Sequence, residues 1–430
     1  MLPTRVADKF DEQLGIKKVD DAHRRPWHVL GDNGEFRLYF AGSVLSDFGT
    51  WLQNTAQMLL AYQLTHSVLT VGLVTFAQFT SPLLLGPWAG VLTHKLGGRS
   101  ALLCTQVISA VVAAALAGLD FGGMLNVPAL VAGAIVGGLA FTFALPARNV
   151  TVQRLVEPEK LKPAYAMDTV SYNLGRALAP LLTIGIGVAG VNFAWAFAAN
   201  SLSFVAFSVI LWRVRLRPAV EPTQPSRVRD GLQVACKDGR MMILLLMVAA
   251  VTVADDPILV LGPALAKQLH VSPTWSAWFI AALGAGTVCG SFRRSKHKAT
   301  LRLAATALAA LALCMLIFVF APSIWIAVAA ALGAGVSCLV ANSVTRSVLA
   351  RRAKPQDAAA VMAVWAIAWA GSKPFASLVD GVLGSWIGPQ WTGLILAMPA
   401  LIPIVVIMLL PKLGFWIARN RTAAADAARG

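Results

Sequence analysis

Long apolar runs, separated by short breaks that contain charges, Gly or Pro, fill the chain from residue 36 to residue 411. A helix of about 20 apolar residues spans the hydrocarbon core of a bilayer, which is about 30 Å thick. Runs of that length lie at residues 36–63, 67–92, 100–120, 127–147, 165–190, 193–212, 241–264, 275–292, 303–320, 323–345, 359–384 and 392–411. The pattern therefore predicts an all-α integral membrane protein with twelve transmembrane helices.

The composition agrees with a membrane protein. Of the 430 residues, 57% are hydrophobic and only 13% are charged, and the mean hydropathy is +0.69. About 25% of the residues of a soluble globular domain are charged. These values exclude a purely soluble enzyme.

The net charge of +16 gives the orientation of the helices. With the N-terminus in the cytoplasm, all but three of the 36 Lys and Arg residues fall on the cytoplasmic side, the exceptions being Lys267, Arg176 and Lys373. A nucleic-acid-binding chain would instead show one dense basic cluster with interleaved aromatic residues. We therefore expect a multi-pass monomer in the cell (inner or plasma) membrane, with both termini in the cytoplasm and the lipid bilayer, not nucleic acid, as its partner.

The longest interior break contains three prolines and divides the predicted helices six and six. We expect a cytoplasmic N-terminal extension at residues 1–35, an N-terminal six-helix bundle at 36–212, a cytoplasmic linker at 213–240, a C-terminal six-helix bundle at 241–411 and a cytoplasmic tail at 412–430. The extension has no apolar segment of the kind that a cleavable signal peptide needs.

Little in the chain indicates an enzyme or a metal site. The five cysteines and six histidines are scattered and form neither a disulfide framework nor a set of metal ligands. A membrane-embedded enzyme would need clustered catalytic groups such as a His/Asp set, and a sensor would usually carry an additional soluble domain. We therefore expect no enzymatic activity and no cofactor beyond a proton gradient.

The two halves share one specific feature. The fifth and eleventh predicted helices each carry a cation between two glycines that lie ten residues apart. These residues are Gly175, Arg176 and Gly185 in the first half and Gly371, Lys373 and Gly381 in the second. Because transporters are often built from internal repeats, we interpret the match as two six-helix repeats with a buried cation at equivalent depth.

The segment after the second helix, GVLTHKLGGR at 90–99, resembles the signature loop of the major facilitator superfamily, and its matching positions are Gly90, His94, Lys95, Gly97 and Arg99. Segments at 36–53, 64–92, 145–148 (LPAR), 172–180 (YNLGRALAP), 195–204 and 373–378 (KPFASL) are similar to the drug and siderophore exporter branch, of the enterobactin-exporter-like or transmembrane secretion effector type. The resemblance implies two pseudo-symmetric six-helix bundles that alternate about a central cavity. Such carriers most often export small molecules against protons.

Two positions depart from the pattern of the superfamily. His94 stands where the loop usually has Asp, so the carboxylate-to-Arg latch between the bundles does not carry over as such; His94 could instead make this gating loop sensitive to pH near neutrality. Drug/proton antiporters also often have an Arg in the fourth helix, whereas Arg148 falls in the predicted loop 148–162. Proton coupling must therefore come from other residues of this chain.

Five acidic residues within the predicted helices are singled out: Asp47, Asp168, Asp255, Asp256 and Asp380. Because a charge at the centre of a bilayer costs on the order of 3 kcal/mol, each is a functional candidate. Asp168 and Asp380 lie nearer the ends of their spans, where side chains reach water more easily. The other three are the stronger candidates for proton coupling.

The sequence Asp255-Asp256-Pro257 predicts a break in the seventh helix, because proline lacks a backbone donor and disfavours helical geometry at the residue before it. Two adjacent carboxylates in a low dielectric do not both ionise readily, so one of them should bind a proton near the working pH. A proton carrier requires such a group. The alternative is that these acids only neutralise Arg176 or Lys373. In turn, Arg176 could either attract an anionic substrate or simply pair with an acid.

Two helix faces are candidates for the substrate cavity. Ser43, Asp47, Thr50, Asn54 and Gln57 recur at helical spacing and form one polar face of the first helix, which either lines a cavity or makes interhelical hydrogen bonds. On the eleventh helix, Trp365, Trp369 and Lys373 share a face that could orient an aromatic or anionic ligand, or could pack inside the protein.

These features together predict a secondary active transporter. We expect it to export a small amphipathic molecule, such as a drug, a siderophore or a natural product, by proton antiport with alternating access. Each pH unit of a proton gradient supplies about 1.4 kcal/mol. An uptake carrier or a lipid flippase of the same fold is the alternative.

Overall fold

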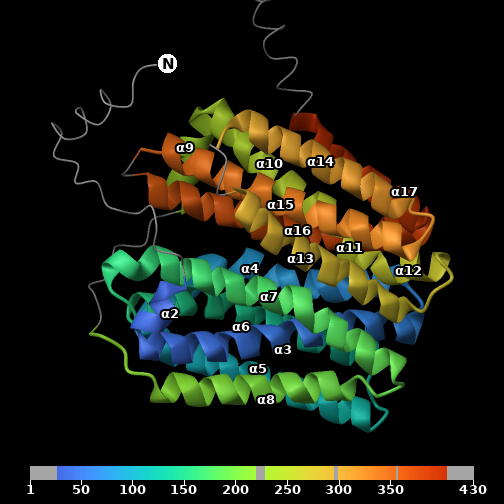
Figure 1. Cartoon of the computed structure of the whole chain (residues 1–430), viewed down its shortest axis with the longest axis horizontal. Coiled ribbons are helices and arrows are strands. Elements are labelled where there is room, and N and C mark those ends of the chain that lie inside the picture. The colour runs from blue at the N-terminus through green and yellow to red at the C-terminus, as the bar shows by residue number, and fades with distance from the viewer. Residues whose placement is uncertain (1–26, 219–227, 295–298, 355–356, 404–430) are drawn as a thin grey trace, which may run out of the picture.

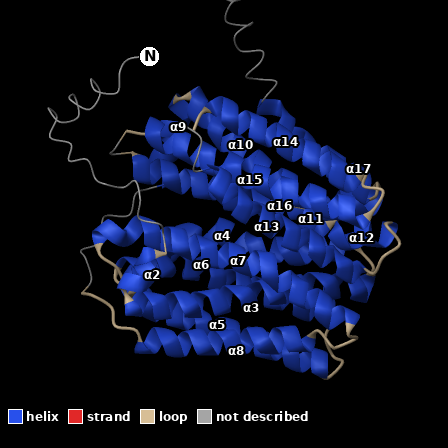
Figure 2. Ribbon diagram, viewed as in Figure 1, coloured by secondary structure: helices blue, strands red, loops and turns tan. Residues whose placement is uncertain are grey.

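The computed structural model describes residues 27–218, 228–294, 299–354 and 357–403, and within these ranges it is helical with short connections and no strand (Figures 1 and 2). The helices are α2 (His28–Asp32), α3 (Gly34–Thr65), α4 (Val68–Leu96), α5 (Gly98–Phe121), α6 (Val127–Gln153), η1 (Pro158–Lys160), α7 (Leu161–Val188), α8 (Ala194–Arg213), α9 (Val228–Lys237), α10 (Gly239–Asp255), α11 (Pro257–Val260), α12 (Gly262–Gln268), η2 (Pro273–Ser276), α13 (Ala277–Arg294), α14 (Leu301–Val319), α15 (Ile324–Arg352), α16 (Ala358–Trp386), α17 (Pro389–Ala397) and η3 (Met398–Leu401).

The described helices follow the predicted spans. Helices α3 to α8 correspond to the first six, α10 to α12 together to the seventh, and α13 to α16 to the next four. The twelfth predicted span begins in α17, and its part from residue 404 onward lies outside the described residues. In the described part, seven spans are long and apolar enough to cross a membrane; α3, α7 and α16, which carry most of the intramembrane polar residues, are not among them.

Several helices extend beyond their predicted ends, and in α4 and α6 the extension includes residues that were predicted to lie in loops. Helix α4 continues to Leu96, so residues 90–96 are helical and not the predicted loop. Helix α6 runs through Pro146 to Gln153 and includes Arg148, which had been expected in a loop. Both predictions were wrong because loss of apolar character shows where a helix leaves the lipid, whereas the helix itself continues as long as its backbone hydrogen bonds and side-chain partners support it.

Short polar residues and glycine define several helix ends. The side chains of Asn33 and Asn126 accept hydrogen bonds from backbone N–H groups at the starts of α3 and α6. Gly97 turns the chain between α4 and α5 with a φ of 80°, which glycine adopts freely. Asp238 at the start of α10 accepts a hydrogen bond from Arg352 at the end of α15, and this bond lowers the pKa of the Asp238 carboxyl.

The helices form two bundles, α2 to α8 and α9 to α17, which lie one above the other in Figure 1. The main contacts between the bundles join α4 to α16 and α7 to α13. We call the end of the molecule at Gly97 and Val214 the linker end, because the chain passes from the first bundle to the second there. The opposite end, at His66 and Gly388, is the far end.

Glycines on α4 show where the bundles touch. A Cβ atom added at Gly72, near the far end, would lie 2.5 Å from the carbonyl oxygen of Ser377 on α16. Gly86 and Gly90 lie on nearly the same face of α4, about four and five turns closer to the linker end. A Cβ atom at either of them would have no neighbour within 4 Å. Helix α4 therefore packs against α16 at the far end and diverges from α16 toward the linker end.

Helices α7 and α13 show the same divergence. A Cβ atom at Gly284 would lie 2.7 Å from the backbone nitrogen of Ala177, and Thr287 donates a hydrogen bond of 2.9 Å to the side chain of Asn173. One turn closer to the linker end on α7, Thr169 is exposed. In the described residues, the two bundles are thus closed against each other at the far end and separate toward the linker end.

Candidate functional site

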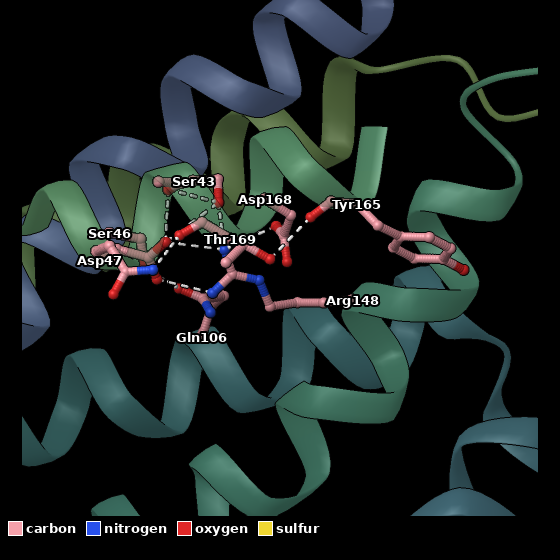
Figure 3. Close-up of polar contacts among 10 residues, drawn as sticks. Ser43, Ser46, Asp47, Gln106, Arg148, Tyr165, Asp168 and Thr169 are labelled. Atoms are coloured by element: carbon pink, nitrogen blue, oxygen red, sulfur yellow. Dashed lines mark hydrogen bonds and ion pairs between the residues drawn. The ribbon is translucent and has the colours of Figure 1, made fainter. Parts of the chain in front are cut away.

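An ion cluster joins three helices of the N-terminal bundle (Figure 3). Arg148 on α6 contacts Asp47 on α3 through two hydrogen bonds of 2.7 and 3.0 Å, and Asp168 on α7 at 3.1 Å. Ser171 donates a hydrogen bond of 2.5 Å to Asp47, and Ser43 accepts one from Arg148. One guanidinium group therefore pairs with two carboxylates.

Arg148 was missed as a site residue by the sequence prediction. It follows Pro146 at the point where the apolar run ends, and its charge was assigned to the loop. The side chain is only 14% exposed, because the guanidinium turns inward to the two acids. The LPAR segment at 145–148 was the available signal, since it resembles exporters that have an Arg in this helix.

The helix is interrupted at one residue, since α10 ends at Asp255 and α11 begins at Pro257, but Asp256 keeps helical dihedral angles (φ −64°, ψ −36°), so the predicted departure from helical geometry before Pro257 is absent. The two adjacent acids have different partners. Asp256, which is fully buried, accepts hydrogen bonds from Lys373 at 2.7 Å and Ser377 at 2.5 Å, both on α16.

Asp255 has weaker contacts than its neighbour. The Nη2 atom of Arg176 lies 3.7 Å from its carboxylate, and the thiol of Cys338 on α15 donates to it at 3.7 Å. Both acids thus have a cationic partner, as the alternative interpretation of the sequence expected. An ion pair does not exclude a role in proton coupling, because a pair that opens during transport exposes its carboxylate.

Asp380 lies one turn beyond Ser377 on α16, and it is fully buried. Both of its carboxylate oxygens lack a hydrogen-bond partner among the described residues, and the side chain is near enough to Asp256 to interact with it electrostatically. The expectation that Asp380 and Asp168 lie within easy reach of water was wrong for Asp380, which packing encloses, and Asp168 is paired with Arg148.

The cations of the predicted repeat lie at the junction between the bundles. Arg176 belongs to α7 of the first bundle but pairs with Asp255 of the second, and its guanidinium lies 5.3 Å from the ring centre of Trp51. Lys373 on α16 of the second bundle lies 5.1 Å from the ring of Phe79 on α4 of the first. Both cations therefore link the two bundles at the level of the broken helix.

The polar face of α3 lines a pocket inside the N-terminal bundle, with a volume of about 100 Å³. Asp47, Thr50, Asn54 and Gln57 all contribute to its wall, together with residues from α4 to α8. Ser43 does not line it and instead hydrogen-bonds within the ion cluster. The prediction named one wall of this pocket, but the helices opposite could not be assigned from spacing along a single helix.

The tryptophans of α16 contact each other. The rings of Trp365 and Trp369 are stacked, with centroids 6.2 Å apart, and Arg346 of α15 lies 4.9 Å from the ring centre of Trp365. Lys373, one turn further along, is directed to Asp256 instead. Trp369 is 38% exposed, so packing covers only part of its surface.

The signature segment lies at the linker end. Gly90 and Lys95 are in the last turns of α4, and the turn follows at Gly97. Arg99 donates a hydrogen bond to the carbonyl oxygen of Trp212 on α8, so it is engaged within its own bundle. The side chain of His94 lies outside the described residues.

The charges at the junction between the bundles do not balance. Three acids, Asp255, Asp256 and Asp380, lie there with two cations, Arg176 and Lys373. The described residues contain no group of three or more His, Cys, Asp or Glu side chains that could hold a metal ion. Carboxylates inside the membrane often mark proton pathways.

Comparison with known proteins identifies the family. The family model described as transmembrane secretion effector matches residues 26–427. The chain is also 25% identical over 201 residues to the uncharacterized MFS-type transporter y4rN of Sinorhizobium fredii. That match covers 46% of this chain and spans about half, 49%, of the relative.

Solved structures of similar fold include a mutant of the nucleoside transporter NupG, with a TM-score of 0.72, 12% identity and coverage of 86% of this chain and 99% of that one. A bacterial homologue of the human lysosomal transporter Spinster, inward-facing and unoccupied, gives a TM-score of 0.65 and 13% identity, with coverage of 87% and 94%. For the human organic anion transporter MFSD10 the TM-score is 0.64 and the identity 16%, with coverage of 86% and 98%. These likenesses confirm the predicted all-α major facilitator fold, and the chain belongs to the transmembrane secretion effector family of major facilitator superfamily transporters.

Proposed function

We propose that this transporter exports a small amphipathic molecule from the cytoplasm by proton antiport. The observation that carries the proposal is the surplus of buried carboxylates at the junction of two bundles that are closed at only one end. A proton bound there is able to change the contacts between the bundles, because Arg176 and Lys373 connect both bundles to the broken helix.

Asp380 is the residue best placed to carry the proton, together with Asp256 and Asp255. It has no cation of its own and shares the surroundings of Asp256, whose charge is already matched by Lys373. Protonation of one of these carboxylates leaves the other paired with Lys373. Loss of that proton places two negative charges beside one ammonium group and favours rearrangement of α16 against α10.

The distribution of basic residues supports a cytoplasmic linker end. Among the described Lys and Arg residues, Lys267 is the only one toward the far end, whereas Lys95, Arg99 and Arg217 are among many at the linker end. The bundles separate toward that side, so the state in the structure favours loading from the cytoplasm. The proposal locates the protein in the inner or plasma membrane, with both chain termini in the cytoplasm.

Transport into inverted membrane vesicles tests the proposal. The probes are labelled chloramphenicol, ethidium and a catecholate siderophore, which represent a neutral, a cationic and an anionic amphipathic compound. At a gradient of one pH unit, exchange of one proton supports at most about tenfold accumulation. We expect accumulation of at least one probe, which Asp380→Asn abolishes while exchange of the probe without a gradient persists. Glu159→Gln, which changes an exposed acid, is the control.

Two outcomes would contradict the proposal. If Asp255→Asn, Asp256→Asn and Asp380→Asn, singly and together, leave the proton-driven accumulation unchanged, these acids do not couple transport to protons. If probes accumulate only in right-side-out vesicles, or if only a fluorescent phospholipid crosses the bilayer, the chain is an uptake carrier or a flippase and not an exporter.

A further inference from the structure

A cluster of amide side chains surrounds the pocket in the N-terminal bundle. Its members come from four helices, α3, α4, α5 and α8, and are Gln53, Asn54, Gln57, Gln78, Gln106 and Asn200. The pocket lies behind α3, inside the bundle, and not between the two bundles. Helix packing alone does not require six amides around one small space. Each buried amide costs desolvation free energy unless it is hydrogen-bonded.

The amides satisfy one another only in part. Gln78 donates to Asn54 at 3.2 Å, Asn200 donates to Gln53 at 2.7 Å, and Ser46 donates to Gln106 at 3.2 Å. Each amide has both a donor and an acceptor group, and each of these bonds uses one of them. Among the described residues, no partner is present for the side-chain NH₂ groups of Gln53, Asn54 or Gln106.

Aromatic rings form another part of the wall. Trp51 lines the pocket and is only 6% exposed, and its Nε1 atom is fully enclosed, so this N–H group is not accessible from the pocket. Phe141 and Tyr172 provide further aromatic surface in the wall, so the pocket combines flat apolar faces with unused hydrogen-bonding groups.

The charges at the pocket favour an uncharged ligand. Asp47 and Arg148 are its charged lining residues, and the two are bonded to each other. The volume of about 100 Å³ is below the about 300–1,000 Å³ of a site that encloses a drug-sized molecule. The pocket therefore fits one ring or head group of a larger ligand.

We propose that this amide pocket binds the head group of the transported molecule, and that the head group is an uncharged planar ring with carbonyl, amide or hydroxyl groups on its edge. The ring lies against the aromatic wall, and its edge makes hydrogen bonds with Gln53, Asn54 and Gln106. This assignment rests on the proposed transport function and adds the class of substrate to it.

Binding of three matched fragments to the full chain in lipid nanodiscs tests the assignment without transport. The fragments are 4-hydroxybenzamide, which is neutral, 4-hydroxybenzoate, which is an anion, and 4-hydroxybenzylamine, which is a cation. Ligand-observed NMR measures their binding. We expect the neutral fragment to bind with a Kd on the order of 1 mM, as is usual for a ligand with few atoms, and the two charged fragments to bind at least about tenfold more weakly.

Variants of the amides separate a ligand site from structural packing. Asn54→Leu and Gln106→Leu remove the hydrogen-bonding groups at similar volume, and each should weaken binding of the neutral fragment by about two- to tenfold. Gln63→Leu, an exposed amide on the same α3 helix, should leave it unchanged. Gln106→Glu should shift the preference toward the cationic fragment, a gain that a misfolded chain cannot show.

The outcomes distinguish this assignment from the transport proposal. If all three fragments bind equally, or if the Asn54 and Gln106 variants bind the neutral fragment like the unchanged protein, the assignment is wrong even where vesicles transport a probe. If the neutral fragment binds selectively and the variants weaken it while no vesicle shows transport, the pocket assignment stands and the transport proposal fails.

Discussion

Arg148 is the residue on which the charge balance of the N-terminal bundle depends, since it alone pairs with both Asp47 and Asp168. Removing one partner of a buried ion pair costs about 3–5 kcal/mol, because the remaining charge stays desolvated. We therefore predict that Arg148→Met lowers the thermal unfolding temperature of the purified protein strongly. Arg148→Lys should be intermediate, because an ammonium group cannot form the two parallel bonds of a guanidinium.

A double-mutant cycle provides the control for this prediction. If the pair is the cause, Arg148→Met combined with Asp47→Asn should be less destabilising than the sum of the two single changes. Arg213→Met, at the exposed end of α8, should have little effect. Additive effects of the Arg148 and Asp47 changes would show that the ion pair does not stabilise the bundle.

At this scale, the sequence identifies residues but not their partners. A charge within an apolar run is visible without a structure, so Asp47, Asp255, Asp256, Arg176 and Lys373 were found. The partners were not, because helices that are far apart in sequence determine them. The burial of Asp380 and the inward orientation of Arg148 were not predicted for a related reason: distance from the end of a run does not show whether a side chain turns to water or into the bundle.

Helix α4 has different surroundings along a single face. Gly72 packs against the backbone of α16, whereas Gly86 on the same face has open space. We predict that Gly72→Val disrupts the far-end contact and that Gly86→Val, the matched change, does not. The positions of the helices were predictable from hydropathy, but this difference depends on how the bundles are tilted.

Labelling from the far end measures this effect. Val68 is 7% exposed and packs beside Gly384 at the far end of α4 and α16. In a chain whose exposed native cysteines have been replaced by serine, Val68→Cys should react slowly with a maleimide that does not cross the membrane. Gly72→Val should accelerate this reaction several-fold. If Val68→Cys reacts with the maleimide at equal rates in the Gly72→Val and Gly86→Val variants, the contact at Gly72 does not hold the far end closed.

In the described residues, the two bundles are closed against each other at the far end and separate toward the linker end. Alternating access requires the far end to open and the linker end to close. Rocking of the bundles about their contacts would bring the linker-end half of α4 toward α16, where Gly86 and Gly90 lie on the face that Gly72 uses at the far end. Because these glycines have no side chains, α4 and α16 have room to approach each other equally closely when the linker end is closed.

A bulky residue at Gly90 should therefore block closure of the linker end without harming the state in the structure. We predict that Gly90→Leu abolishes accumulation in inverted vesicles and leaves the unfolding temperature unchanged, because nothing lies within 4 Å of an added Cβ atom there. Val91→Phe adds bulk at the adjacent exposed position and should preserve transport. Transport by Gly90→Leu at the rate of the unchanged protein would mean that the linker end closes through another face of α4 and that Gly90 has no part in this closure.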